Sequence, residues 1–163
     1  HAARSNFDLT YLLLDNAIYG LTKGQTSPTS PVGMVSSTTP FGNIPRPLNA
    51  TTLALAYGAT FVARVFSRNR DQVSEMITRS VAHKGFSFIH VLSPCIEFHK
   101  TVTYDSVHKK VTPLPKEHST SNRTEAIALS ESEDPLYQGL FIEEQTKTYH
   151  DHVNDVVSRL GSS

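Results

Sequence analysis

Residues suited to binding a metal ion follow the first apolar segment of the chain. That segment, LTYLLL at residues 9–14, runs directly into Asp15 and Asn16. Carboxylate and amide oxygens are ligands that Mg²⁺ accepts, and the ion usually shares its coordination with phosphate oxygens. Asp and Asn are also ordinary turn residues, and for this pair taken alone a turn is the simpler interpretation.

The residues that come next are suited to holding a phosphate group. Thr22 and Lys23 lie between two glycines, Gly20 and Gly24. Because glycine lets the main chain approach a ligand closely, the amides around both glycines can bind phosphate oxygens together with the threonine hydroxyl. The lysine adds a positive charge. A metal and a phosphate are therefore both expected at this loop.

The elements that must position the loop read as alternating strands and helices. A short apolar run such as residues 9–14 is typical of a strand that is buried on both faces of a parallel sheet. Two more strands and two helices follow, and we expect the strands at ATFVARVF and FSFIHVLS, one helix at LALAYG and another ending near His83. This alternation predicts an α/β fold with a parallel sheet covered by helices.

Local signals set the ends of the two helices. Thr51 or Thr52 can cap the first helix, and Gly58 is suited to ending it. Asn69 or Asp71 can open the second helix. Four apolar residues share one face of this second helix and are expected to pack on the sheet: Val73, Met76, Ile77 and Val81.

A second group of interesting residues follows a neighbouring strand. In parallel sheets, ligands bind beyond the carboxyl ends of the strands. Asp15-Asn16 and Ser93-Pro94-Cys95 both follow expected strands, so we expect them to share one edge of the sheet. Cys95 is the only cysteine, so it cannot form an internal disulfide, and a buried small hydrophobe is its simplest interpretation.

Composition excludes several classes of function. The 163 residues carry a formal net charge of zero, which gives no reason to expect a nucleic acid or an anionic membrane as partner. No apolar run is long enough to cross a bilayer, and nothing resembles a signal peptide, so a reducing, cytoplasmic setting is the default. The chain starts at His1, and HAARSN reads as the end of a helix, so we expect the chain to be the C-terminal part of a longer protein.

The last part of the chain has a different character. Residues 96–163 are polar and read as an arm, with a short helix at NRTEAIALSE and one more strand at LYQGLFIEE. Two histidine-containing stretches, HKTVTYDSVH and YHDHVND, can be read as metal sites, but we expect their histidines to be solvated.

One continuous set of motifs resembles a known family. DNAIYGLTKGQTSPTS is similar to the thiamine-diphosphate loop in β-subunits of 2-oxoacid:ferredoxin oxidoreductases of the 2-oxoglutarate type. TTPFGNI, ATFVAR and HKGFSFIHVLSPC also match the pattern of this family. The resemblance implies a partial thiamine-diphosphate-binding fold over residues 1–95 and a C-terminal extension over residues 96–163.

The resemblance implies a role for each residue of the loop. Asn16 would be a side-chain ligand of the Mg²⁺ that bridges to the cofactor diphosphate, and the main-chain carbonyl of Ile18 would be another ligand. Thr22 would hydrogen-bond the diphosphate, and Tyr19 and Gly20 would line the same cofactor site.

Two further loop residues would act near the reacting centre. Leu21 would lie against the cofactor and help to enforce its bent shape. Lys23 would place a cation beside the substrate, where pyruvate-specific relatives tend to have glycine. A second carboxylate, as in 2-oxoglutarate, can pair with it. The simpler alternative is a solvated lysine that touches phosphate, and broad 2-oxoacid specificity is also compatible.

Cys95 acquires a new meaning through the resemblance. SPC matches the place where the family contributes a thiolate to a [4Fe–4S] cluster, whose remaining cysteines would lie upstream of His1. The Gly-Asp-Gly motif that carries another Mg²⁺ ligand is absent from this sequence too. The chain therefore carries only part of each implied site.

The function that the resemblance implies is oxidative decarboxylation of a 2-oxo acid to an acyl-CoA, with electrons passed through the cluster to ferredoxin. An α-subunit would be the obligate partner. Two alternatives stay open. One is a truncated, non-catalytic paralogue that serves as an interaction module. The other is a non-oxidative thiamine-diphosphate decarboxylase or synthase.

Overall fold

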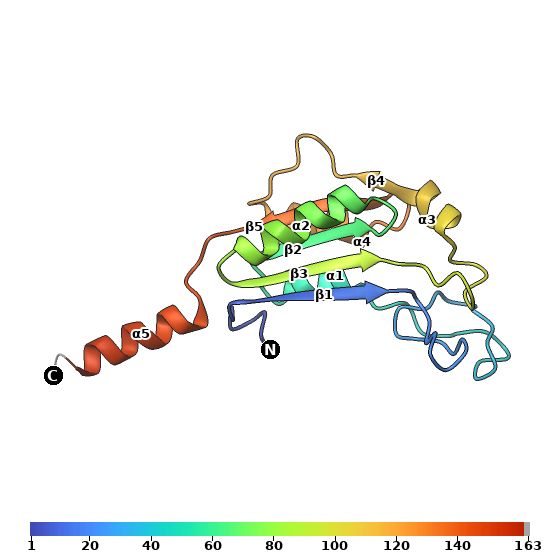
Figure 1. Cartoon of the computed structure of the whole chain (residues 1–163), viewed down its shortest axis with the longest axis horizontal. Helices are drawn as coiled ribbons and strands as arrows, with labels where there is room; N and C mark the ends of the chain where they lie inside the picture. Colours follow the sequence, from blue (N-terminus) through green and yellow to red (C-terminus); the bar gives the residue numbers. More distant parts are fainter. Residues whose placement is uncertain (162–163) are drawn as a thin grey trace.

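Five strands form one sheet in the computed structural model, which describes residues 1–161 (Figure 1). Their order is β1-β3-β2-β5-β4. The strands are β1 (Leu9–Asp15), β2 (Phe61–Phe66), β3 (Phe86–Leu92), β4 (Val111–Pro113) and β5 (Leu136–Glu143). β1, β3 and β2 run parallel, which confirms the expected parallel sheet. β5 departs from it, because it pairs antiparallel with β2.

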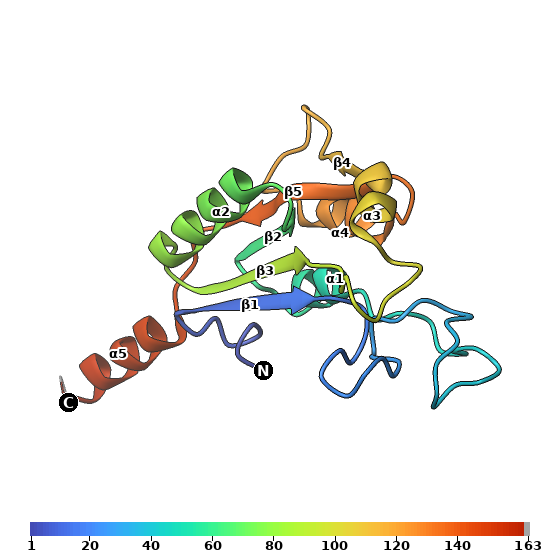
Figure 2. The same cartoon turned by 45° about the vertical axis from the view of Figure 1, so that its right-hand side comes forward.

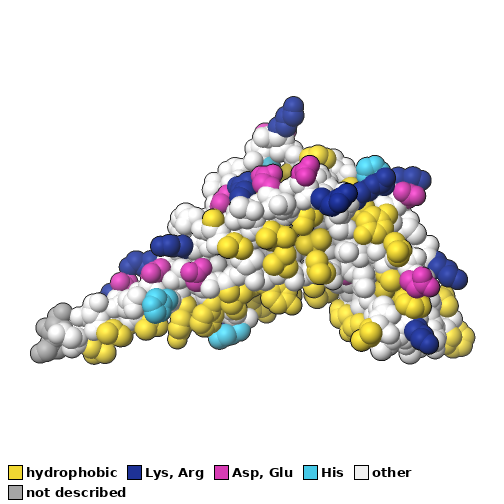
Figure 3. Space-filling model, viewed as in Figure 1, with side chains coloured by type: hydrophobic (Ala, Val, Ile, Leu, Met, Phe, Trp, Pro, Cys, Tyr) yellow, Lys and Arg dark blue, Asp and Glu magenta, His cyan; other side chains and the backbone are white. Residues whose placement is uncertain are grey.

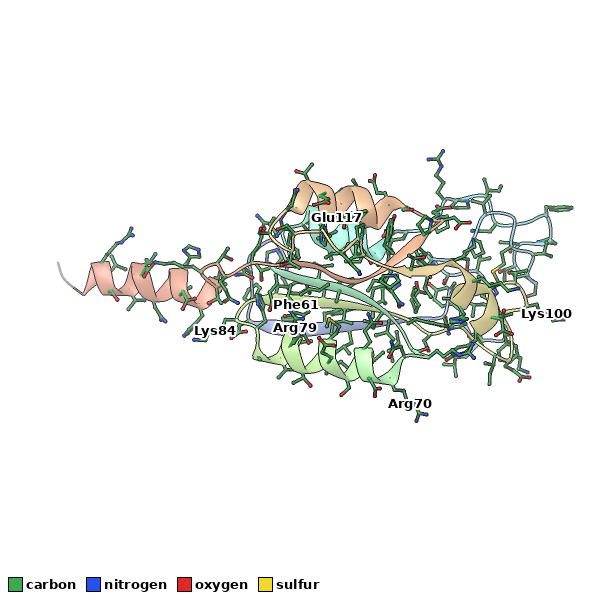
Figure 4. All side chains as sticks on the ribbon, turned by 90° about the horizontal axis from the view of Figure 1, so that it is seen from above. Phe61, Arg70, Arg79, Lys84, Lys100 and Glu117 are labelled. Carbon is green, nitrogen blue, oxygen red and sulfur yellow. The ribbon has the colours of Figure 1, made fainter. Side chains whose placement is uncertain are left out.

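Helices cover both faces of the sheet. They are α1 (Ala50–Ala56), α2 (Arg70–Ala82), α3 (Tyr104–Lys110), α4 (Arg123–Glu131) and α5 (Tyr149–Leu160). Figure 4 shows α2 on one face of the sheet and α1 with α4 on the other, with Arg70 pointing away from the body. Within residues 1–161, no helix combines the length and apolar character needed to cross a membrane.

The central strand β2 explains why both faces need cover. All six of its residues are buried. Phe61 and Val65 pack with Met76 of α2, whereas Val62 packs into the cluster beneath α1 and α4. A strand with apolar side chains on both faces is stable only between two layers of helices.

Asparagines cap α1 and α2, which corrects one expectation. Asn49 caps α1 by accepting a hydrogen bond from the main-chain N–H of Thr52, in place of the expected Thr51 or Thr52. Asn69 caps α2 as expected. Gly58, with φ of +82°, follows the end of α1 and takes the left-handed conformation that glycine favours.

Two expectations about burial are wrong. β1 is not buried on both faces: none of its residues is buried, and Leu14 is 71% exposed at this edge of the sheet. Val81 is also exposed, because α2 turns it away from the sheet. Figure 3 shows apolar side chains gathered along the lower side of the view, where Figure 1 places β1 and α5.

The N-terminal segment forms turns where the sequence suggested a helix end. The main-chain N–H of Ser5 donates to His1 O at 3.1 Å, and that of Phe7 donates to Ala2 O at 3.1 Å. Phe7 then packs against Tyr149, the first residue of α5, with ring centroids 4.6 Å apart. From this contact α5 extends away from the sheet, without a buried residue of its own (Figures 1 and 2).

Part of the polar C-terminal extension enters the core. The expected helix and strand of this segment form as α4 and β5. Ala126 of α4 and Phe141 and Ile142 of β5 are fully buried in the same cluster as α1 and β2. Residues 123–143 are therefore structurally continuous with the sheet, whereas α5 keeps the character of an arm.

A chain of buried hydrogen bonds crosses the α1 side of the sheet. Asp15 Oδ2 lies 3.0 Å from His90 Nε2, and His90 Nδ1 lies 3.1 Å from Thr51 Oγ1. Arg64 Nε donates to the same Thr51 oxygen at 3.2 Å. Since Thr51 Oγ1 accepts from Arg64, its own hydrogen is free to bond Nδ1, which leaves the histidine proton on Nε2, facing Asp15.

Arg64 joins the two halves of the chain at the end of this network. It is 2% exposed, and its guanidinium donates to Tyr137 O and Ser130 O, both at 3.1 Å. Burial lowers the pKa of Arg64 to about 10, so the group stays charged at neutral pH. Within residues 1–161 no carboxylate lies within ion-pair distance of it. The carbonyl of Ser130 at the end of α4 and the carbonyl of Tyr137 in β5 stabilise the charge instead.

We expect Arg64→Met to destabilise the protein by about 3 kcal/mol, because the carbonyls of Ser130 and Tyr137 and the Thr51 hydroxyl each lose a hydrogen bond from the guanidinium group. Chemical unfolding monitored by circular dichroism would measure the change. Arg70→Met is the matched control, since Arg70 is exposed, and it should change stability by less than about 0.5 kcal/mol. Equal stability of the two variants would contradict a joining role for Arg64.

Candidate cofactor-binding site

Two loops meet at the carboxyl edge of the parallel strands. The long loop 16–49 follows β1, and the segment 93–103 follows β3, which lies beside β1 (Figure 2). The main-chain N–H of Ser93 donates to Asp15 O at 2.7 Å, so the two loops start side by side. This confirms the expectation that Asp15-Asn16 and Ser93-Pro94-Cys95 share one edge.

Asp15 anchors the long loop. Its Oδ1 accepts from the Ala17 main-chain N–H at 2.9 Å and from Thr29 Oγ1 at 2.6 Å, while Oδ2 faces His90. Burial would raise the pKa of Asp15, but hydrogen bonds from His90 and Thr29, the electrostatic attraction of His90 and the Ala17 amide together outweigh it, so the pKa is lowered. With both oxygens engaged inside the chain, Asp15 is a turn anchor and not a free metal ligand.

The next residues place main-chain and side-chain oxygens close together. Asn16 Oδ1 accepts from the Ile18 main-chain N–H at 3.1 Å, and Ala17 between them has φ of +57°. The side chain of Ile18 is buried, which fixes the course of the main chain. Within the described residues, no donor hydrogen-bonds the Ile18 carbonyl. Asn16 Oδ1 and this carbonyl are suited to a hard cation.

Three consecutive amides of the loop are available to an anion. Across residues 1–161, the main-chain N–H groups of Gly20, Leu21 and Thr22 have no acceptor. The amide of Gly24, in contrast, donates to Tyr19 O at 2.9 Å and is engaged within the turn, while phosphate binding by the amides around Gly20 stays a prediction. The turn closes on itself at Gly24, and the preceding amides stay open.

Thr22 already has a partner in the turn. Its hydroxyl donates to Gln25 Oε1, and Gln25 Nε2 donates back to Thr22 O at 2.7 Å. The Tyr19 main-chain N–H donates to Gln25 O at 2.9 Å. A diphosphate bond to the Thr22 hydroxyl would have to replace the bond to Gln25.

Leu21 and Lys23 project from the loop. Leu21 is 98% exposed, which leaves a large apolar side chain without cover on this chain. Lys23 is also exposed and has φ of +73°, a conformation that costs a lysine roughly 1–2 kcal/mol. No carboxylate within residues 1–161 pairs with its ammonium group.

Gly20 brings the loop against Cys95. A Cβ at Gly20 would lie 3.5 Å from Asn16 Nδ2 and 3.8 Å from Cys95 Sγ. The space between the amide of Asn16 and the sulfur is therefore the space that any larger side chain would fill. The candidate metal ligand and the only cysteine lie on the two sides of the same glycine.

Main-chain amides surround the sulfur of Cys95. Phe98 N–H donates to Sγ at 3.5 Å, and the amides of Glu97 and His99 add to it. These bonds, led by that of Phe98, lower the pKa of the Cys95 thiol despite partial burial. The site favours a thiolate, which is the form that binds metals. Within the described residues, no group of three or more His, Cys, Asp or Glu side chains could hold a metal ion alone.

Sequence reasoning missed the roles of two histidines. His99 was expected to be solvated, but its side chain is buried, and the residue is 3% exposed. His118 is buried as well, and its Nε2 lies 2.9 Å from Phe141 O. His90 carried a usable signal, since a histidine inside the apolar strand FSFIHVL needs a buried polar partner.

Two protein-family models match the chain. Residues 1–91 match the thiamine pyrophosphate enzyme, C-terminal TPP binding domain. Residues 95–157 match the C-terminal part of the pyruvate ferredoxin oxidoreductase beta subunit. The exact division into residues 1–95 and 96–163 stays a prediction.

Several curated proteins are similar in sequence. The chain is 41% identical over 110 residues to the 2-oxoglutarate oxidoreductase subunit KorB of Mycobacterium tuberculosis. The aligned region covers 68% of this chain and 29% of that protein. It is 30% identical over 163 residues to the 2-oxoglutarate synthase subunit KorB of Methanocaldococcus jannaschii, covering 99% of this chain and 60% of that protein. The chain thus spans less than two thirds of the length of these relatives.

A solved structure gives the same result. The 2-oxoglutarate:ferredoxin oxidoreductase from Magnetococcus marinus, determined with 2-oxoglutarate, coenzyme A and succinyl-CoA bound, matches with a TM-score of 0.95 and 38% identity. The match covers 99% of this chain and 56% of that chain. From these matches, the chain belongs to the thiamine pyrophosphate enzymes, among the β-subunits of the 2-oxoacid:ferredoxin oxidoreductases.

Proposed function

We propose that this chain forms part of a thiamine-diphosphate-dependent oxidoreductase that converts 2-oxoglutarate and CoA to succinyl-CoA and passes electrons to ferredoxin. The observation that carries the proposal is the arrangement around Gly20. There, open amides, oxygen ligands for a cation and a thiol lie together at the carboxyl edge of the sheet.

The loop after β1 would hold the cofactor. Asn16 Oδ1 and the Ile18 carbonyl would bind Mg²⁺, and the open amides of Gly20, Leu21 and Thr22 would bind diphosphate oxygens. Bound thiamine diphosphate supplies the carbon nucleophile and the electron sink that decarboxylation of a 2-oxo acid requires. Leu21 would lie against the cofactor, which would give this exposed apolar side chain the cover that the chain itself does not provide.

Cys95 would bind a [4Fe–4S] cluster. Amides that surround a sulfur favour its thiolate form, and hydrogen bonds to cluster sulfurs tune the reduction potential. The short separation between Gly20 and the Cys95 sulfur would bring the cluster close to the cofactor loop, as electron transfer between them requires. The remaining cysteines of such a cluster would come from outside this sequence.

Lys23 would select the substrate. Its left-handed backbone is a strained conformation for a lysine, and such strain is retained where the side chain has a role. A charge-assisted bond to the distal carboxylate of 2-oxoglutarate would contribute roughly 1.5–3 kcal/mol. Pyruvate has no distal carboxylate and would gain nothing from it.

The exposed apolar residues of the long loop support an α-subunit as partner. Leu21, Phe41 and Ile44 are each at least 87% exposed, and Val32 and Val35 are exposed beside them in sequence. A subunit interface would cover such residues. A cytoplasmic location belongs to the proposal, because a cluster-ligand thiol needs reducing surroundings.

The test of the proposed function is an assay of the purified natural complex. We expect bound thiamine diphosphate, a [4Fe–4S] spectrum, and ferredoxin reduction that requires both 2-oxoglutarate and CoA. Decarboxylation without CoA or ferredoxin would favour a non-oxidative thiamine enzyme. Absence of thiamine diphosphate after addition of Mg²⁺ and the partner would favour a non-catalytic interaction module.

Replacement of Lys23 tests the substrate. In the complex, Lys23→Gly should lower kcat/KM for 2-oxoglutarate about tenfold or more, and that for pyruvate much less. Lys23→Arg keeps the charge and should retain most of the preference. Steady-state kinetics with both substrates measures the ratio. Equal losses for the two substrates would rule out pairing with the distal carboxylate.

Replacement of Cys95 tests the cluster. Cys95→Ala should abolish [4Fe–4S] assembly in the complex while thiamine diphosphate is retained, because the sulfur contributes to one site and not to the other. Iron analysis and electron paramagnetic resonance measure the cluster, and Cys95→Ser serves as an isosteric control. A cluster of normal content and spectrum in Cys95→Ala would refute the ligand role.

A further inference from the structure

We propose that His99 is a positioning residue that couples the cofactor loop to the Cys95 segment. The proposal rests on the proposed function for its significance, and on the contacts of this chain for its geometry. His99 lies in the segment after β3, and it reaches both loops of the site with different parts of the same residue.

The hydrogen bonds of the His99 ring define its tautomer. The Val102 main-chain N–H donates to Nδ1 at 3.1 Å, so Nδ1 is an acceptor and the ring hydrogen is on Nε2. Thr101 Oγ1 lies 3.4 Å from the same nitrogen. Nδ1 is therefore fully engaged by its own segment, and only Nε2 is available to another part of the chain.

Nε2 is buried and has no hydrogen-bond partner within the described residues. A buried donor without an acceptor is costly and calls for an explanation. Burial lowers the pKa of His99. The main-chain carbonyl of Ala17 and the negative charge of Asp15 lie near the ring and partly offset this lowering. The Ala17 carbonyl is therefore the acceptor that we assign to the Nε2 hydrogen of His99.

Ala17 is the residue whose conformation sets the ligand geometry. It stands between Asn16 and Ile18, and its φ of +57° turns the chain so that both of their oxygens remain at the site. Non-glycine residues hold this conformation only when surrounding contacts enforce it. Asp15 fixes the amide of Ala17 from one side, and Ser30 Oγ donates to its carbonyl at 2.7 Å. His99 would add a second donor to that carbonyl.

The main chain of His99 contacts the other half of the site. Its amide is one of those near Cys95 Sγ that lower the pKa of the thiol, and the preceding amide, that of Phe98, donates to Sγ at 3.5 Å. A shift of the Ala17 turn would therefore move the ring, and through its backbone the environment of the sulfur. The inference is that binding at the cofactor loop and the environment of the Cys95 sulfur are mechanically linked through this residue.

Hydrogen–deuterium exchange of the full chain tests the link without any cofactor. His99→Phe keeps a ring of similar size and removes both nitrogens, and it should speed exchange of the hydrogen-bonded loop amides, those of Ala17, Ile18, Tyr19, Lys23 and Gly24, at least about tenfold. His99→Gln can accept from Val102 and donate to Ala17, and it should restore slow exchange. His118→Phe is the matched control, because it removes another buried histidine from the core far from the loop in sequence.

The outcomes separate this inference from the proposed function. Faster exchange of these hydrogen-bonded loop amides in His99→Phe alone supports the coupling. Unchanged exchange there, or an equal increase in His118→Phe, would overturn it. In the complex, His99→Phe should also weaken Mg²⁺-dependent retention of thiamine diphosphate about tenfold. Wild-type protein that retains none would overturn the proposed function, while the exchange result would still decide the role of His99.

Discussion

The carboxylate of Asp15 is the interaction on which the rest of the site depends. Asp15 is the last residue of β1, an edge strand, and its carboxylate accepts hydrogen bonds from the Ala17 amide, from Thr29 and from His90. It thereby connects two parts of the long loop, at Ala17 and at Thr29, to the neighbouring strand β3. Through His90 and Thr51 it is also connected to the guanidinium of Arg64. A negative and a positive charge are thus both buried without direct contact, and neutral polar groups between them carry the stabilisation. The loop geometry and the docking of α4 and β5 share this single network.

Much of the fold could be predicted from the sequence because its signals are local. Apolar runs, asparagines and glycines marked β1, β2, β3, α2 and α4, and the alternation of strands and helices indicated the parallel core. The antiparallel pairing of β5 with β2 could not be read in this way, since it joins residues 75 to 82 positions apart and depends on which edge of the sheet remains open. The exposure of β1 has the same origin: an apolar run indicates side chains that can be buried, but not how much of each face of the strand other elements cover.

In the candidate site, too, residue types predicted the kind of ligand, whereas only the folded contacts show which groups are available to it. Residue types in the loop indicated a cation and a phosphate, yet only the folded turn shows that the Gly24 amide is consumed and those of Gly20, Leu21 and Thr22 are open. The approach of Cys95 to Gly20 depends on the register of β1 against β3, which residue types alone do not specify. His99 was misjudged because the polarity of its surroundings in sequence suggested solvent, whereas the segment folds back and buries the ring.

The division between buried anchors and exposed ligand groups has a physical reason. Groups that hold the loop, such as Asp15 and His90, are withdrawn from solvent, where their hydrogen bonds are strongest. Groups suited to ligands are less engaged: within the described residues the open amides and the Ile18 carbonyl have no hydrogen-bond partner, and the Cys95 sulfur is contacted by main-chain amides alone. Neither the oxygen set nor the single thiolate within the described residues completes the coordination that Mg²⁺ or a [4Fe–4S] cluster requires. A rigid half-site of this kind loses little conformational entropy when the complementary ligands arrive, because its own share of the geometry is already fixed by the fold.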